Sequence, residues 1–181
     1  MGRNIQKKFD KIKPSLKVYS LNTNQVSNQA TKMVQNKKVT NELVYKKDST
    51  NMPTRFKHGF EAKKIVEQIM GESFIDYSVH KAASNSKPDL HPLGYNVNIY
   101  VSRVGRAHMV PHDIKYGGIF LNYDKDCYYN LGYGSAETIN RYVDIEEVDT
   151  EEARERKTGF YEIEELQHFD SFQTFEAIFY K

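Results

Sequence analysis

The sequence predicts an α+β fold: a single domain with a central mixed or antiparallel sheet, one amphipathic helix before it, and an extended basic N-terminal arm. Between residues 87 and 134, β-branched and aromatic runs alternate with turn residues, which is typical of neighbouring strands. A segment with the apolar spacing of a helix precedes them. The first 57 residues are polar and basic. We therefore divide the chain into a basic, extended or disordered arm, residues 1–57, and an α+β globular domain, residues 58–181.

The arm differs from the domain most strongly in charge. Residues 1–57 hold thirteen Lys or Arg against three acidic residues, a net charge of +10, whereas residues 58–181 hold thirteen against twenty-one, a net charge of −8. Apolar residues in the arm are isolated, so their burial cannot offset the entropy of ordering it. Such an arm would contact nucleic acid or another subunit; a solvated tail is the competing interpretation. The lysines expected to make the contacts are Lys7, Lys8, Lys11, Lys13, Lys37, Lys38, Lys46 and Lys47.

The domain begins with a predicted helix over Gly59–Gly71. Its apolar residues, including Ile65 and Ile69, recur at the spacing of one helical face, and Gly71 is a typical helix terminator. The following residues, Glu72–Val79, alternate in polarity, which favours a strand.

The central sheet is predicted from three further runs. Tyr95–Val104 is β-branched and aromatic, as strands are. Arg106–Gly118 contains a proline and paired glycines, so we expect a connection there. Ile119–Tyr123 and Cys127–Leu131 flank a short polar turn and predict a β-hairpin.

The C-terminal part predicts smaller elements. Ser135 suits the cap of a short helix or turn before a run over Tyr142–Val148. Gly159–Leu166 alternates apolar and acidic residues, which favours a strand. Aromatic and aliphatic residues then recur every three positions, which favours a closing helix and leaves a terminal strand open. They are Phe169, Phe172, Phe175 and Ile178.

Composition limits the compartment. Cys127 is the single cysteine, so the chain forms no internal disulfide and nothing points to an oxidising environment. No apolar run is long enough for a membrane span or a signal peptide. The abundance of Asn, Lys and Tyr fits an AT-rich genome, such as that of a phage or mobile element. We expect no membrane association, and a cytoplasmic protein, or a virion protein if the chain is phage-encoded.

Three features are spaced as in one nuclease family. Glu61 lies early in the predicted helix, Asp89 follows Pro88, and the triplet 98–100 begins nine residues after Asp89. This arrangement, over residues 59–131, resembles the PD-(D/E)XK superfamily of restriction endonucleases and Holliday-junction resolvases. The resemblance implies that Glu61 and Asp89 bind Mg²⁺, which prefers oxygen ligands, and that the chain cleaves nucleic acid.

The triplet departs from the family pattern at two positions. Asn98 stands where the family has an acid, and Tyr100 stands where it has lysine. An amide carries no charge, and a neutral phenol cannot replace a lysine electrostatically. Catalysis is therefore left open, with the balance against it. The chain would otherwise need no cofactor, and an enzyme on this fold would be a Mg²⁺-dependent nuclease.

Two other residue sets allow alternative interpretations. His91, His108, His112 and Asp113 could supply zinc ligands, but Pro111 disfavours the helix that would align them, and an exposed loop is the competing interpretation. Tyrosines of the predicted strands could form a stacking platform, a subunit interface or core. They are Tyr95, Tyr100, Tyr116, Tyr123, Tyr128, Tyr129 and Tyr133.

Charge decides between the functional hypotheses. A basic arm and an acidic domain favour head-to-tail association, which builds rings or open arrays. We therefore expect a phage-like or mobile-element binding and assembly protein, a homo-oligomer or part of a larger assembly, whose arm contacts nucleic acid or a neighbouring subunit. The alternative is a nuclease, or a catalytically degenerate PD-(D/E)XK-like DNA-binding protein.

Overall fold

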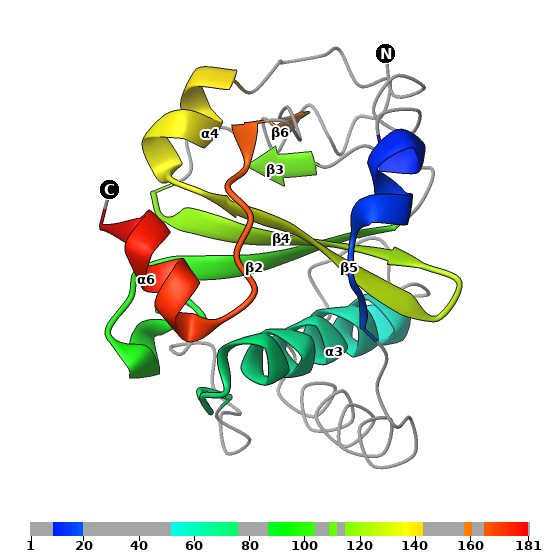
Figure 1. Ribbon diagram of the computed structural model, residues 1–181, viewed down its shortest axis with the longest axis horizontal. Helices are drawn as coiled ribbons and strands as arrows, with labels where there is room; N and C mark the ends of the chain where they lie inside the picture. The colour runs from blue at the N-terminus through cyan, green and yellow to red at the C-terminus, as the bar shows by residue number, and fades with distance from the viewer. Residues whose placement is uncertain are drawn as a thin grey trace.

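The chain folds around a four-stranded mixed sheet (Figure 1). The computed structural model describes residues 9–19, 52–75, 87–103, 109–111, 115–142, 158–160 and 165–180. In spatial order the strands are β1 (Val18–Tyr19), β5 (Cys127–Gly134), β4 (Gly117–Asp124) and β2 (Val97–Arg103). β2 runs parallel to β4, and the other neighbours are antiparallel. The predicted α+β class with a mixed central sheet is confirmed.

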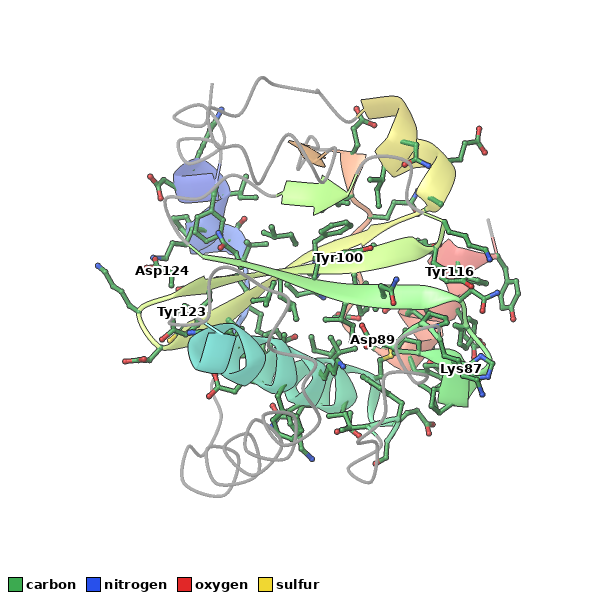
Figure 2. The ribbon with its side chains drawn as sticks, turned by 180° about the vertical axis from the view of Figure 1, so that it is seen from behind. Lys87, Asp89, Tyr100, Tyr116, Tyr123 and Asp124 are labelled. Atoms are coloured by element: carbon green, nitrogen blue, oxygen red, sulfur yellow. The ribbon has the colours of Figure 1, made fainter. Side chains whose placement is uncertain are left out.

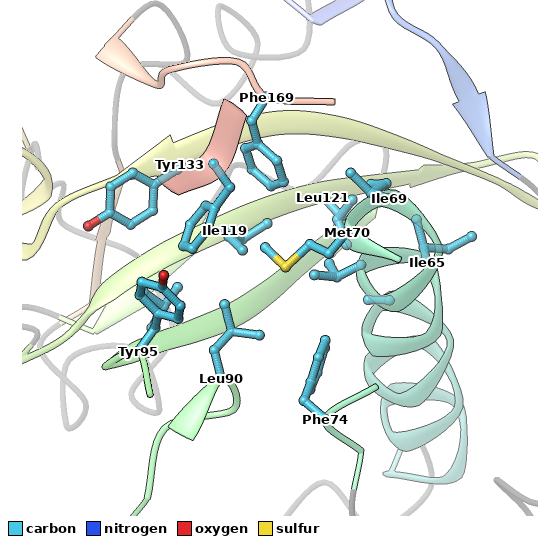
Figure 3. Packing of buried hydrophobic residues seen from close by; sticks show 14 of the residues in the cluster. Ile65, Ile69, Met70, Phe74, Leu90, Tyr95, Ile119, Leu121, Tyr133 and Phe169 are labelled. Carbon is cyan, nitrogen blue, oxygen red and sulfur yellow. The ribbon is translucent and has the colours of Figure 1, made fainter. Parts of the chain in front are cut away.

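Helix α3 (Met52–Met70) covers one face of this sheet. Ile65 and Ile69 are buried against the sheet together with residues of β2 and β4, as the helical spacing predicts (Figure 3). Gly71 ends the helix with a positive φ of 68°. The helix starts seven residues before the predicted Gly59. Pro53 suits its first turn, because the backbone nitrogens of a first turn donate no hydrogen bond within the helix.

The β4–β5 hairpin is confirmed, and a bulge changes how it presents its side chains. Lys125 and Asp126 both have positive φ, which matches the twist of a two-residue hairpin turn. The register shifts between Phe120 and Leu121, which leaves an extra residue on β5. Because of this shift, Tyr128 and Tyr133 both pack in the hydrophobic cluster that includes α3.

Hydrophobic residues fill both faces of the sheet. The larger cluster joins α3, the sheet and helix α6 (Phe172–Phe179), the predicted closing helix, whose Phe175 is fully buried. The second cluster lies on the opposite face and includes Ile139 of helix α4 (Ala136–Tyr142), the predicted short helix after Ser135. The sheet is therefore enclosed between two layers.

The remaining elements are short. β3 (Met109–Pro111), in the predicted connection, pairs antiparallel with β6 (Thr158–Phe160), which begins the strand predicted over 159–166. The 3-10 helices η1 (Lys13–Ser15) and η3 (His91–Leu93) complete the structure. Residues 72–75 of the strand predicted over 72–79 are not in a strand, and the rest lies outside the described residues.

Candidate arm-docking interface

The N-terminal residues 9–19, here called the docking segment, pack on the sheet. Residues 9–12 are helical and continue into η1. Phe9 is 1% exposed, and its ring meets the Tyr129 ring edge-on, with centroids 5.6 Å apart. Ile12 and Leu16 pack in the same cluster. The spacing of these three apolar residues is helical, and this is the signal that could have revealed the docking segment in the sequence.

The docking segment also adds a strand to the sheet. Val18 pairs with Tyr129 and Tyr19 pairs with Tyr128, antiparallel along the outer edge of β5. Loss of hydration and the charge of Asp170 raise the pKa of the Tyr19 phenol. Strand addition to an open edge is a common mode of peptide recognition, since the main chain supplies the hydrogen bonds.

Lys13 joins the docking segment to the tip of the hairpin. Its ammonium group donates to Asp124 and lies 5.4 Å from the centroid of the Tyr129 ring. The hydrogen bond to Asp124 raises the pKa of Lys13. Asp124 lies beside the docking segment in Figure 2. A basic residue of the predicted arm therefore pairs with an acidic residue of the domain.

The structure differs from the predicted extended arm at both ends. Residues 9–19 fold onto the sheet, and residues 52–57 form the start of α3. Among the lysines expected to contact a partner, Lys11 is exposed and Lys13 is paired with Asp124. The others lie outside the described residues: Lys7, Lys8, Lys37, Lys38, Lys46 and Lys47.

Asn122 places a polar group on the face that the docking segment covers. It is 2% exposed and stands directly opposite Tyr129 in the β4–β5 register. Its Oδ1 atom has no hydrogen-bond partner, and it is the only such buried side-chain atom in the described part of the chain. A buried acceptor without a donor costs about 1–3 kcal/mol, so the face that the docking segment covers carries a hydrogen-bonding penalty at Asn122.

Glu61, predicted as a metal ligand, is buried between α3 and the hairpin. It accepts a hydrogen bond from the Tyr128 hydroxyl, which also lies 3.3 Å from Nδ1 of His58. The His58 ring meets the Tyr123 ring edge-on at 4.0 Å. Burial, followed by the Glu61 interaction, raises the pKa of Tyr128. This network links α3 to the hairpin.

Asp89 lies at the edge of β2, next to the triplet that the nuclease resemblance singles out (Figure 2). Its Oδ2 accepts from the Ile99 amide at 2.8 Å, and its own amide donates to Asn98 Oδ1 at 3.3 Å. Lys63 from α3 lies 2.9 Å from the second carboxylate oxygen. Burial raises the pKa of Tyr100. A hydrogen bond to Asn98 lowers this pKa, and the charge of Asp89 raises it by a smaller amount. Asp89, Asn98 and Tyr100 are therefore close together.

Glu61 and Asp89 have different hydrogen-bond partners on the sheet. Tyr128, which binds Glu61, is in register with Arg103 of β2 through Tyr123 of β4. Ile99, which binds Asp89, lies four residues along β2 and two strands across, about 13 Å by 10 Å at standard strand spacings.

Asp89 has protein partners at the position where the resemblance implies a magnesium ligand. Asp89 is the one carboxylate beside the triplet, and both of its oxygens already have partners. No group of three or more His, Cys, Asp or Glu side chains is arranged to hold a metal among the residues that the structure describes. Of the zinc candidates, His91 is exposed, and the other three lie outside those residues.

Most of the tyrosines considered as a platform are core residues. Tyr95, Tyr128, Tyr129 and Tyr133 are buried, and the other three are half-buried. The Tyr95 hydroxyl donates to Glu176 at 2.8 Å, which ties the start of β2 to α6. Tyr116 is half-buried beneath the Lys115 ammonium, 5.4 Å from its ring centroid. The strands therefore bury rings rather than presenting a continuous aromatic surface.

Helices within the described ranges lack the combination of length and apolar character needed to cross a bilayer. Comparisons with protein-family models, curated proteins and solved structures gave no match. Function is therefore inferred from the geometry and charge of this chain alone.

Proposed function

We propose that this protein works by binding, as an assembly component in which the basic arm of one copy contacts the acidic domain of the next. The observation that carries this proposal is the docking segment: Phe9, Lys13 and β1 fit the β4–β5 hairpin by apolar contact, ion pair and strand pairing. An arm that fits its own domain in this way fits the same domain on another copy. A virion or mobile-element protein would use such contacts to form arrays.

Charge supports the same function at longer range. The arm carries a net +10 and the domain a net −8, so two copies attract arm to domain and repel domain to domain. Such attraction extends about 10 Å at 0.1 M salt and about 3 Å at 1 M. Association should therefore weaken as salt is added.

The test compares two variants with the same loss of charge. Lys7, Lys8 and Lys11 are replaced by Gln in one, and Lys87, Lys115 and Lys125 in the other. Light scattering at low and moderate salt should show the first variant associating about tenfold more weakly than wild type, because each lost surface attraction is worth a few tenths of a kcal/mol. The domain variant should associate at least as well as wild type. Equal weakening of both would contradict a role for the arm.

Truncation is a poorer test than substitution. A chain beginning at His58 would lack Phe9, β1 and the first six residues of α3, so it would lose core and sheet as well as charge.

Short duplex DNA should be included in the light-scattering measurements. A wild-type chain that stays monomeric alone and gains mass only with DNA would favour nucleic acid as the partner of the arm.

The contacts of Asp89 favour a second candidate, a catalytically degenerate DNA-binding relative of the PD-(D/E)XK nucleases. Asp89 contacts the triplet as that resemblance implies, but Asn98 replaces the acid and Glu61 lies elsewhere. This candidate predicts DNA binding without cleavage in Mg²⁺. Cleavage that Asp89→Asn abolishes, and that the exposed control Glu72→Gln retains, would instead identify an active nuclease.

A further inference from the structure

We infer that the docking segment is exchanged between copies: residues 9–19 of one chain occupy the β4–β5 hairpin of a second copy, with the contacts seen within one chain. This inference rests on the proposed function and names its binding site. It assigns Phe9, Lys13 and β1 as the ligand, and Asp124 with the outer edge of β5 as the receptor.

The docking segment and its receptor form a discrete module. The Phe9 ring, the Lys13 ammonium and the β1 main chain all contact the hairpin, at Tyr128, Tyr129 and Asp124. The larger core between the sheet and α3 forms without any of these three contributions, apart from the half-buried Tyr19 ring at its margin. Exchange of the segment therefore leaves the main core in place.

The chain between the docking segment and α3 is long enough to permit exchange. Residues 20–51 supply 32 positions between Tyr19 and Met52. Fully extended, they would reach about 100 Å at 3.3 Å per residue. A folded chain of this length has a radius of gyration of about 16 Å, so the hairpin of a neighbouring copy lies within reach.

Concentration decides which hairpin is occupied. The contacts are identical within one chain and between chains, so exchange sacrifices no contact energy. Exchange therefore dominates where copies are packed together, and the remaining arm lysines add attraction to the acidic neighbour. Each chain offers one segment and one hairpin, so the contact repeats head to tail unless two chains exchange their segments reciprocally and close as a dimer.

The test mixes two variants that each break the same ion pair. Lys13→Asp leaves a carboxylate facing Asp124, and Asp124→Lys leaves an ammonium facing Lys13. Each change weakens the contact within one chain and between copies of the same variant alike, so neither variant alone should associate more tightly than wild type. In an equimolar mixture, the segment of the Lys13→Asp variant fits the hairpin of the Asp124→Lys variant through a reversed ion pair. The segment of the Asp124→Lys variant fits the hairpin of the Lys13→Asp variant through the native pair. Opposite charges then meet only between the two variants, so native mass spectrometry of the mixture should show alternating heteromers that form about tenfold more readily than wild-type oligomers, because wild-type segments also bind their own hairpins.

Controls keep the charge changes and move them away from the pair. Lys11→Asp and Glu72→Lys are exposed and carry the same changes. Their mixture should associate no better than the average of the two alone. The Tm of each variant, measured at two protein concentrations, shows that it is folded and shows whether its stability depends on association.

The outcomes separate this inference from the proposed function. A wild-type chain that never associates contradicts the proposed function itself. A wild-type chain that associates, with a mixture no stronger than its separate variants, contradicts exchange at this pair while the arm remains a general contact. Stronger association in the mixture than in either separate variant supports exchange.

Discussion

Buried tyrosines supply much of the polar chemistry of this sheet. Tyr95 and Tyr128 place their hydroxyls on the carboxylates of Glu176 and Glu61, and both phenols have raised pKa values, chiefly because burial disfavours the phenolate. Each pair joins a strand to a helix. The polar contacts therefore fix how α3 and α6 sit against an otherwise apolar core.

These tyrosines predict an alkaline limit to stability. The folded pKa of Tyr128 lies above the ordinary value of 10.0, so only the unfolded chain loses this proton at first as the pH rises. The free energy of unfolding is therefore unaffected below pH 10 and should fall above it by about 1.4 kcal/mol per pH unit for one such group. Urea unfolding at pH 8, 10 and 11 measures this. Tyr128→Phe should flatten the decline, and an equally steep decline in that variant would contradict the assignment.

Position 132 should tolerate no residue other than glycine. Its φ is +119°, and an added Cβ would lie 2.5 Å from the carbonyl oxygen of Gln167, whose backbone pairs with Tyr133 at the outer edge of β5. Gly132→Ala should therefore lower the free energy of unfolding by about 2 kcal/mol. Gly59→Ala is the control, because Gly59 lies inside α3 with open space around it, and should stabilise by about 0.5–1 kcal/mol. Equal effects would contradict the packing described at Gly132.

At the scale of elements, the cap of α6 holds the closing helix. Ser171 Oγ accepts from the Thr174 amide at 3.1 Å, and Thr174 Oγ1 accepts from the Ser171 amide at 3.0 Å. Ser171→Ala should cost about 1 kcal/mol in thermal or urea unfolding. Gln173→Ala, exposed in the same helix, should cost less than about 0.5 kcal/mol. A cost of Ser171→Ala no larger than that of the control would show that the cap contributes little.

Local patterns predict most of the elements. The β2 run, the hairpin and α3 are recognisable because their own apolar periodicity determines how they pack. The start of α3 was missed because its first turns lack that periodicity. The docking segment was missed because Phe9, Ile12 and Leu16 are few, and their burial depends on Tyr129, which lies far along the chain. Propensity cannot report such a contact, since tertiary packing decides it.

The candidate sites were predictable to different degrees. The resemblance placed Asp89 beside Asn98, and the structure brings them together. It also grouped Glu61 with Asp89, whereas Glu61 faces the hairpin. The sequence contains a signal for that position: Glu61 lies four residues before Ile65, on the apolar face of α3, where a buried acid needs a donor. The donor, Tyr128, is set by the hairpin register, which the sequence does not specify.

For the whole molecule, residues 9–19 of the N-terminal arm are part of the fold. β1 and Gln167 cover opposite ends of the outer edge of β5, so removal of the docking segment would expose an unpaired strand edge. An edge that is covered by a replaceable segment suits a protein that assembles by exchanging it. The basic arm of one copy is also attracted to the acidic domain of another, which favours the same contact between copies.

Light scattering on the full wild-type chain, across a range of concentrations at low salt, measures association through the arm. We expect a molar mass that rises above the 21.1 kDa of one chain as concentration increases, and that falls back when salt is added. A mass that stays at 21.1 kDa at every concentration, without any partner added, would contradict it.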